Sequence, residues 1–224
     1  MVNERSNKRF LNYDPNAPFH TFDKIKMYGK AQGETKPSIL SWGCWNGNPR
    51  ITVSTNIESD KVNRSGMINA AFNPETFYAL LDLLEEVANS PNELTYRVDC
   101  KTTSELPEGG RSEPFVASFV MLGKDSEGKV WISVLAENRP KIKFIFTISN
   151  FHTIHEKGKG PISEELASKL QAKATVRLLR NAYYKLVLDY KSNQSKKFKK
   201  ETDSVNNESM TITSSNLNFD DIQM

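Results

Sequence analysis

The sequence predicts an α+β protein made of two antiparallel four-stranded units, each followed by a helix, with a disordered C-terminal tail. Three observations lead to this fold class. Short segments with strand-like alternation or apolar runs occur in two groups of four, and two longer segments carry apolar residues at helical spacing. Residues 191–224 are low in aromatic residues and rich in Ser, Asn, Thr and Lys, a composition that is typical of disorder. The predicted order is therefore four strands, helix, four strands, helix and tail.

The first group of strands follows a polar arm over residues 1–18, which we expect to be flexible. The four strand candidates cover residues 20–30, 39–45, 50–55 and 67–72. Along the first of them, Ile25 and Met27 alternate with an outward set that consists of Lys24, Lys26, Tyr28 and Lys30. Asn46-Gly47-Asn48-Pro49 predicts the turn that joins the second strand to the third.

The first helix is marked at both ends. Asn73 is a good N-cap, and Pro74 stands at the first helical position, where its missing N–H costs nothing. Ser90-Pro91-Asn92 predicts where the helix ends. We expect one buried stripe, formed by Phe77, Leu80, Leu81, Leu84, Val87 and Ala88.

The second group repeats the order of the first. Its strand candidates cover residues 94–102, 115–123, 129–136 and 141–149. A long helix is predicted from Ser163 to about residue 190. Its expected buried stripe contains Leu166, Leu170, Ala174, Leu178, Ala182 and Leu186, widened by Leu179, Tyr183 and Val187. We therefore divide the chain into an arm (1–18), one β-rich domain (19–190) with pseudo-repeats at about 19–90 and 93–190, and a tail (191–224).

Charge is distributed unevenly along the chain. The formal net charge is +3, but residues 201–224 contain five acidic residues and no Lys or Arg. The first 200 residues therefore hold 30 basic and 22 acidic residues, a formal charge of +8. A basic body with an acidic tail is typical of proteins that bind polyanions.

Several function classes find no support in the sequence. No run reaches the roughly 18 apolar residues of a membrane span, and the polar N-terminus lacks a secretory signal, so we expect a cytoplasmic protein without a membrane partner. His152 and His155 have no further ligands at metal-binding spacing, and Gly158-Lys159-Gly160-Pro161 lacks the spacing of a Walker loop. We expect no enzymatic activity, no cofactor and no metal.

Binding of single-stranded nucleic acid is the favoured function, because the predicted strands place cations and aromatic rings on outward positions. Such rings stack on bases while cations contact phosphates. Trp45 and Arg50 flank the predicted turn and should be cross-strand neighbours, whereas Trp42 is the tryptophan that we expect to be buried. The candidate contacts are Lys24, Lys26, Tyr28, Lys30, Trp45, Arg50, Arg97, Lys101, Lys129, Trp131, Lys141 and Lys143. A structural role of the tryptophans and a solubilising role of the lysines remain alternatives.

The end of the chain combines acidic and apolar residues. The candidate partner-binding residues are Leu217, Phe219, Asp220, Asp221, Ile222 and Met224. Such a peptide can dock on a basic pocket of a partner, or compete with nucleic acid for a cationic surface.

This combination resembles the bacterial and bacteriophage single-stranded DNA-binding proteins, in which a basic domain is followed by a linker and an acidic tip. The resemblance lies in residues 218–224, although the familiar tip is more acidic and ends in Pro-Phe. The resemblance of the folded part is to other proteins. Its order of strands and helices is similar to that of the Whirly and positive-cofactor-four-like proteins. The resemblance implies a function in DNA replication, recombination or repair, recruitment of proteins of those processes by the tip, and, for a phage protein, location in the host cytoplasm.

The leading hypothesis is therefore binding of single-stranded DNA with little sequence specificity. A protein-interaction or assembly module without nucleic-acid binding is the first alternative, and a single-stranded RNA-binding regulator is the second. The duplicated unit is compatible with a pseudo-dimer and with a homo-oligomer.

Overall fold

Two antiparallel four-stranded sheets form the β part of the protein. The computed structural model describes residues 19–29, 34–60 and 66–189. Sheet A contains β1 (Phe19–Gly29), β2 (Ser38–Trp45), β3 (Asn48–Ser54) and β4 (Met67–Ala71), in that order. Sheet B contains β5 (Leu94–Thr102), β6 (Phe115–Lys124), β7 (Val130–Leu135) and β8 (Phe144–Ile145), also in order. With the helices α2 (Pro74–Asn89) and α3 (Glu164–Asp189), these sheets confirm the predicted α+β class.

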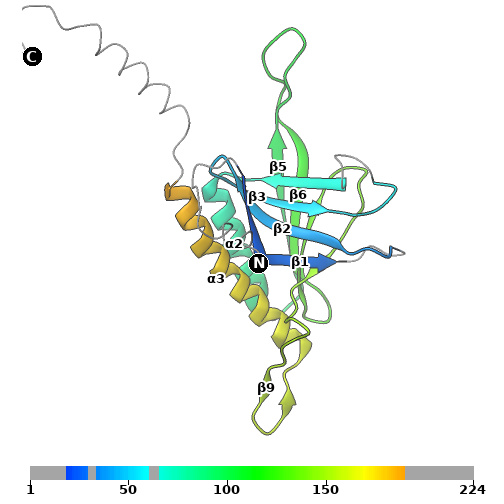
Figure 1. Cartoon of the computed structure of the whole chain (residues 1–224), viewed down its shortest axis with the longest axis vertical. Coiled ribbons are helices and arrows are strands. Elements are labelled where there is room, and N and C mark those ends of the chain that lie inside the picture. Colours follow the sequence, from blue (N-terminus) through cyan, green and yellow to red (C-terminus); the bar gives the residue numbers. More distant parts are fainter. Residues whose placement is uncertain (1–18, 30–33, 61–65, 190–224) are drawn as a thin grey trace, which may run out of the picture. The chain divides into compact units, whose positions relative to one another are not determined.

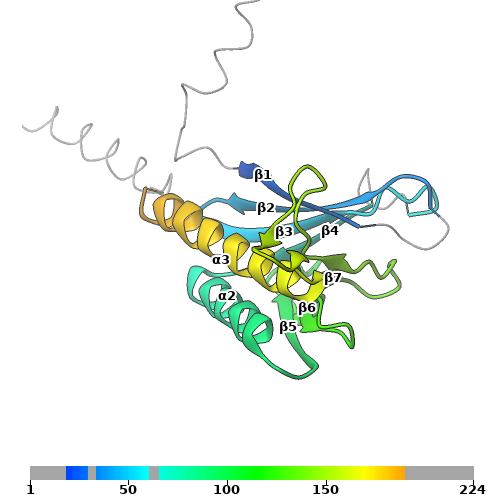
Figure 2. The ribbon, with the colours of Figure 1, turned by 90° about the horizontal axis from the view of Figure 1, so that it is seen from below.

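The two sheets cross each other and share one hydrophobic core with the helices. In Figure 1, β2, β3 and the end of β1 run across the view while β5 and β6 run along it. Figure 2 shows α2 and α3 side by side against the sheets. Arg180 of α3 joins the two helices by ion pairs to Asp82 and Glu85 of α2. The core contains the inward residues of both sheets, so each sheet buries its inner face within one shared core.

Helix α2 forms as the sequence predicts. Asn73 accepts a hydrogen bond from the backbone N–H of Thr76 at 2.9 Å and thereby caps the first turn. The buried side chains are the six expected ones. Phe77 makes edge contacts with Trp42 of β2 and with Phe72, which fixes the helix against sheet A.

The hairpin between β2 and β3 is tighter than expected. Only Asn46 and Gly47 form the turn, and both have positive φ (48° and 77°), as a type I′ turn requires. Asn48 and Pro49 already belong to β3, where they pair with Trp45 and Cys44. The two-residue turn sets the register of the whole hairpin.

An ion pair joins the two halves of the protein. The carboxylate of Asp60, in the loop after β3, accepts two hydrogen bonds from Arg139, which follows β7, at 2.7 and 2.9 Å. The hydroxyl of Thr55 donates a further bond at 2.7 Å. Both charged side chains are nearly buried, and these bonds hold the pKa of Asp60 below its ordinary value.

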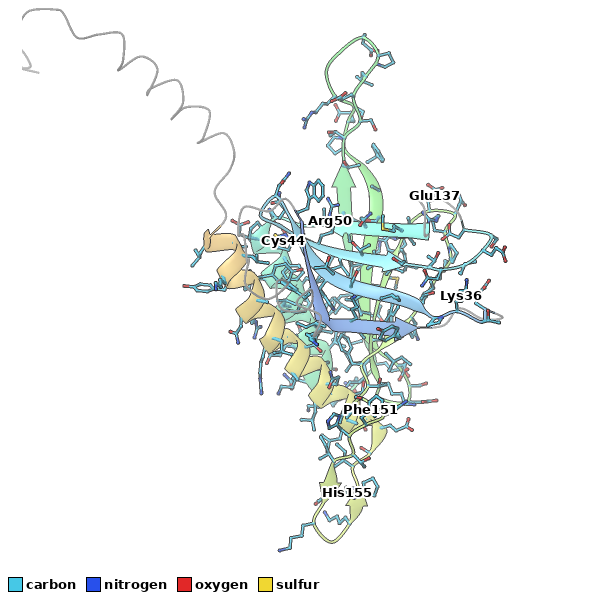
Figure 3. All side chains as sticks on the ribbon, viewed as in Figure 1. Lys36, Cys44, Arg50, Glu137, Phe151 and His155 are labelled. Atoms are coloured by element: carbon cyan, nitrogen blue, oxygen red, sulfur yellow. The ribbon has the colours of Figure 1, made fainter. Side chains whose placement is uncertain are left out.

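The predicted strand over residues 141–149 is wrong in its length, because only Phe144 and Ile145 form a ladder with β7. Its alternation is nonetheless real, since Ile142, Phe144 and Phe146 are all buried. A further hairpin, β9 (His155–Glu156) with β10 (Gly160–Pro161), stands between β8 and α3, where no strand was predicted. It projects from the body in Figures 1 and 3. The predicted order of elements is therefore not reproduced in full.

The predicted buried stripe of the second helix is wrong in part, although Leu179, Tyr183 and Leu186 are buried as expected. Leu166, Leu170 and Leu178 are exposed, and Ala174 is exposed as well. The buried residues are Ala172, Val176, Leu179, Tyr183 and Leu186. The phenol of Tyr183 donates a hydrogen bond to the backbone oxygen of Gly43, and its ring packs against Phe22 and Phe77. Apolar residues surround much of this helix, so their spacing alone does not select the face that docks.

Other predictions lie outside the described residues. These are the flexible arm over 1–18, the contact residue Lys30, and the tail over 191–224 with its tip residues. Of the helices in the described part of the chain, none is both long and apolar enough to cross a membrane.

Candidate nucleic-acid interface

The outer face of sheet A carries a row of polar side chains that runs across all four strands. Lys26 of β1 pairs with Ser41 of β2, Ser41 with Thr52 of β3, and Thr52 with Asn69 of β4. Residues that pair directly lie on the same face of a sheet. The hydroxyl of Ser41 donates to the Thr52 backbone oxygen at 3.3 Å, and the hydroxyl of Thr52 donates to Asn69 Oδ1 at 2.7 Å. These bonds link the row from β2 through β3 to β4.

An aromatic ring and a guanidinium flank this row near the turn at Asn46 and Gly47. Trp45 is 42% exposed, and the guanidinium carbon of Arg50 lies 5.6 Å from the centre of its ring. The expected proximity of the two residues is therefore present. They are diagonal neighbours, however, because Trp45 pairs with Asn48 and Arg50 pairs with Gly43.

Arg50 is a cation with an unmatched donor. Its Nε is buried and has no hydrogen-bond partner among the described residues. Burial lowers the pKa of Arg50 from its ordinary value, yet an arginine remains charged at neutral pH. A half-buried guanidinium beside an exposed ring suits a ligand that brings both a negative charge and a flat surface. Figure 3 shows Arg50 and Cys44 near each other at one end of sheet A.

Tyr28 stands on the other side of the polar row. It pairs with Ile39, and its side chain is 63% exposed. Ile39, the partner of Tyr28, is six residues from Trp45 in β2. At the usual rise per strand residue, Tyr28 and Trp45 are therefore separated by about 20 Å along the sheet. The outer face of sheet A thus offers two rings with hydroxyl, amide and ammonium groups between them.

The predicted contacts on β1 keep their outward positions in part. Lys24 is exposed, whereas Lys26 is only half-exposed. A shift of register between Thr21 and Lys26 disturbs the pairing of β1 with β2, and Lys24 lies within it. The predicted alternation is nonetheless present from Lys24 to Tyr28, because Ile25 and Met27 pack against the core while Lys24 and Tyr28 are exposed.

The second-half candidates lie on sheet B and form separate groups. Trp131 is 9% exposed and lies beneath Lys143, whose Nζ is 4.7 Å from the ring centre. An exposed Trp131 platform is therefore wrong. Its ring crosses Gly123, its direct partner on β6, where an added Cβ would lie 2.9 Å from the ring. The structure does not place these groups beside Trp45.

The remaining basic candidates differ in their surroundings. Arg97 forms an ion pair with Asp99 at 2.6 Å and lies 4.1 Å above the centre of the Phe119 ring. Lys129 forms ion pairs with Glu127 and Glu164, and these carboxylates raise its pKa. Because its charge is already matched, Lys129 is a poor phosphate ligand. Exposed candidates elsewhere on sheet B and its loops are Lys101, Lys141 and Lys143.

Sequence reasoning missed the polar row itself. Ser41 and Thr52 each stand between two buried residues of a strand, which is the pattern of an outward position. Asn69 has the same position between Ile68 and Ala70. Alternation in the sequence therefore contained the signal, although it did not show that the three residues are aligned across the sheet.

Comparisons with known proteins assign no family. No family model matches the chain, and no curated protein or solved structure is significantly similar to it.

Proposed function

We propose that the outer face of sheet A binds single-stranded DNA with little sequence specificity. The Trp45–Arg50 pair is the observation that carries this proposal, because it combines an exposed ring with a desolvated cation. A ring stacks on any base, and a guanidinium contacts any phosphate, so the pair favours strand binding without selecting a sequence. The polar row between Trp45 and Tyr28 supplies donors and acceptors for sugars and phosphates.

The proposal includes a role in DNA replication, recombination or repair. It is supported by the +8 charge of residues 1–200 and by the acidic, apolar end of the chain. We propose that residues 217–224 recruit a partner protein of these processes. We also propose that the two sheet-plus-helix units are pseudo-repeats, since each half contains four antiparallel strands and a following helix.

The matched pair Trp45 and Trp42 tests the stacking role. Both lie in β2, but Trp42 is fully buried. We expect Trp45→Leu to weaken binding of a mixed-sequence 30-mer of single-stranded DNA about tenfold, because one stacked base is worth roughly 1–3 kcal/mol. Trp42→Phe should leave the affinity of the folded protein unchanged. Fluorescence anisotropy with a labelled 30-mer measures both.

Unchanged affinity of Trp45→Leu would remove the basis of the proposal. A loss of affinity in both variants with folding intact would also contradict it, because the effect would then not depend on the exposed ring. Circular dichroism of each variant verifies that it is folded.

A further inference from the structure

A groove of about 460 Å³ lies between the edge strand β1, residues 145–150 at and after the end of β8, and helix α3. Its first wall consists of five consecutive residues of β1, from Lys24 to Tyr28. The second wall is formed by residues 145–150, and α3 contributes Gln171, Thr175 and Leu178. The volume falls within the roughly 300–1,000 Å³ that sites for small ligands occupy.

The groove borders the outer face of sheet A. Tyr28 belongs to both surfaces and is largely exposed. Lys24 and Lys26 line the same wall, so cations and an aromatic ring stand at its margin. A nucleic-acid strand that passes from Trp45 over the polar row to Tyr28 would reach the groove next.

The lining combines apolar and amide groups in the way that suits a nucleobase. Ile25 and Leu178 offer apolar surface to the face of a base. Asn150 and Gln171 carry side-chain amides, each of which can donate and accept hydrogen bonds at a base edge. The hydroxyl of Thr175 donates its hydrogen bond to the Gln171 backbone oxygen at 2.9 Å, so it has no donor left for a base.

The shape of the groove argues against an added peptide strand. β1 and sheet B meet at Gly29, where an added Cβ would lie 3.0 Å from the Phe144 ring and 3.1 Å from Ile142. This contact leaves little room for a further strand beside β1 at the end of the groove where Tyr28 lies. The register shift between Thr21 and Lys26 also interrupts the regular strand that peptide addition needs.

We propose that this groove is a nucleotide subsite, in which one base of a bound strand meets the amides of Asn150 and Gln171 while its phosphate contacts Lys24 or Lys26. The proposal rests on the proposed binding of single-stranded DNA and adds a modest base preference to it. The four bases differ in their donors and acceptors, so fixed amides favour one of them.

Full-length protein and labelled 20-mers of dT, dC and dA test the subsite by fluorescence anisotropy. We expect the unsubstituted protein to prefer one homopolymer about fivefold, the effect of about one net hydrogen bond. The double substitution Asn150→Ala with Gln171→Met should reduce the preference to less than about twofold. Asn181→Met removes an amide from an exposed position of α3 outside the groove lining and should keep the preference.

The outcomes separate the subsite from the proposed function. Equal binding of all three homopolymers by the unsubstituted protein overturns the subsite and leaves single-strand binding in place. A preference that survives in the double variant overturns the subsite as well. Failure of every oligonucleotide to bind overturns both proposals together.

Discussion

At the scale of single residues, Asp60 is the side chain whose environment gives the clearest prediction. It is nearly buried and bonded to Arg139, so Asp60→Asn leaves a guanidinium without its charge partner. We expect the free energy of unfolding to fall by about 3 kcal/mol at pH 7, as for other broken buried pairs. Asp99→Asn disrupts the exposed Arg97 pair and should cost less than about 1 kcal/mol. Urea denaturation measures both changes.

The pH dependence of this loss follows from the lowered pKa of Asp60 in the folded state. A carboxyl whose pKa is lower when folded stabilises the protein above its unfolded pKa of 3.8. That contribution disappears as the pH falls through the folded pKa. The difference between the unsubstituted protein and Asp60→Asn should therefore narrow as the pH falls below about 5, through the unfolded pKa of 3.8 and on through the lower folded pKa. A difference that stays constant over this range would show that the Asp60 charge does not stabilise the fold.

Residue environments were only partly predictable from the sequence. The Asn46-Gly47 turn made the proximity of Trp45 and Arg50 predictable, because a two-residue turn fixes which residues lie near each other. The burial of Trp131 was not predictable, since it depends on Gly123 in β6 and on Lys143 in the segment that follows β7. The Asp60–Arg139 pair was not predictable for the same reason, because the two residues are 79 positions apart in the sequence.

At the scale of elements, the orientation of α3 gives a second prediction. Leu178 and Leu179 are sequence neighbours, but their exposed fractions are 55% and 0%. We expect Leu179→Ala to lower the free energy of unfolding by about 2–5 kcal/mol, whereas Leu178→Ala should cost less than about 1 kcal/mol. Thermal or urea denaturation of the two variants compares them directly. Similar costs at both positions would contradict the orientation of α3 in the structure.

Helices α2 and α3 show why one stripe was predictable and the other was not. The apolar residues of α2 are confined mainly to one face, so helical periodicity identifies the buried side chains. Those of α3 spread around the helix, from Leu166 and Leu178 on the exposed side to Val176 and Tyr183 on the buried side. The docking face is then decided by tertiary contacts such as that of Tyr183 with Gly43.

At the scale of the whole molecule, the distribution of charge gives a third prediction. Deleting residues 201–224 changes the formal net charge from +3 to +8. We expect affinity for single-stranded DNA to hold or rise, and any rise should be larger at low salt because ions screen the repulsion of the removed acids. Anisotropy titrations of the full-length and shortened proteins at about 50 and 200 mM salt measure this. A clear fall in affinity after the deletion would contradict the prediction.

We propose that sheet A binds single strands through exposed rings, and such rings cannot stack on the bases of a duplex because those bases are already stacked inside it. Competition of unlabelled single-stranded DNA, single-stranded RNA and duplex DNA against a labelled 30-mer of single-stranded DNA tests this most directly. We predict micromolar or tighter binding of single-stranded DNA at low salt, weaker binding at higher salt, and displacement by duplex at least about tenfold less effective. No binding at low salt, or equal displacement by duplex, would contradict the claim.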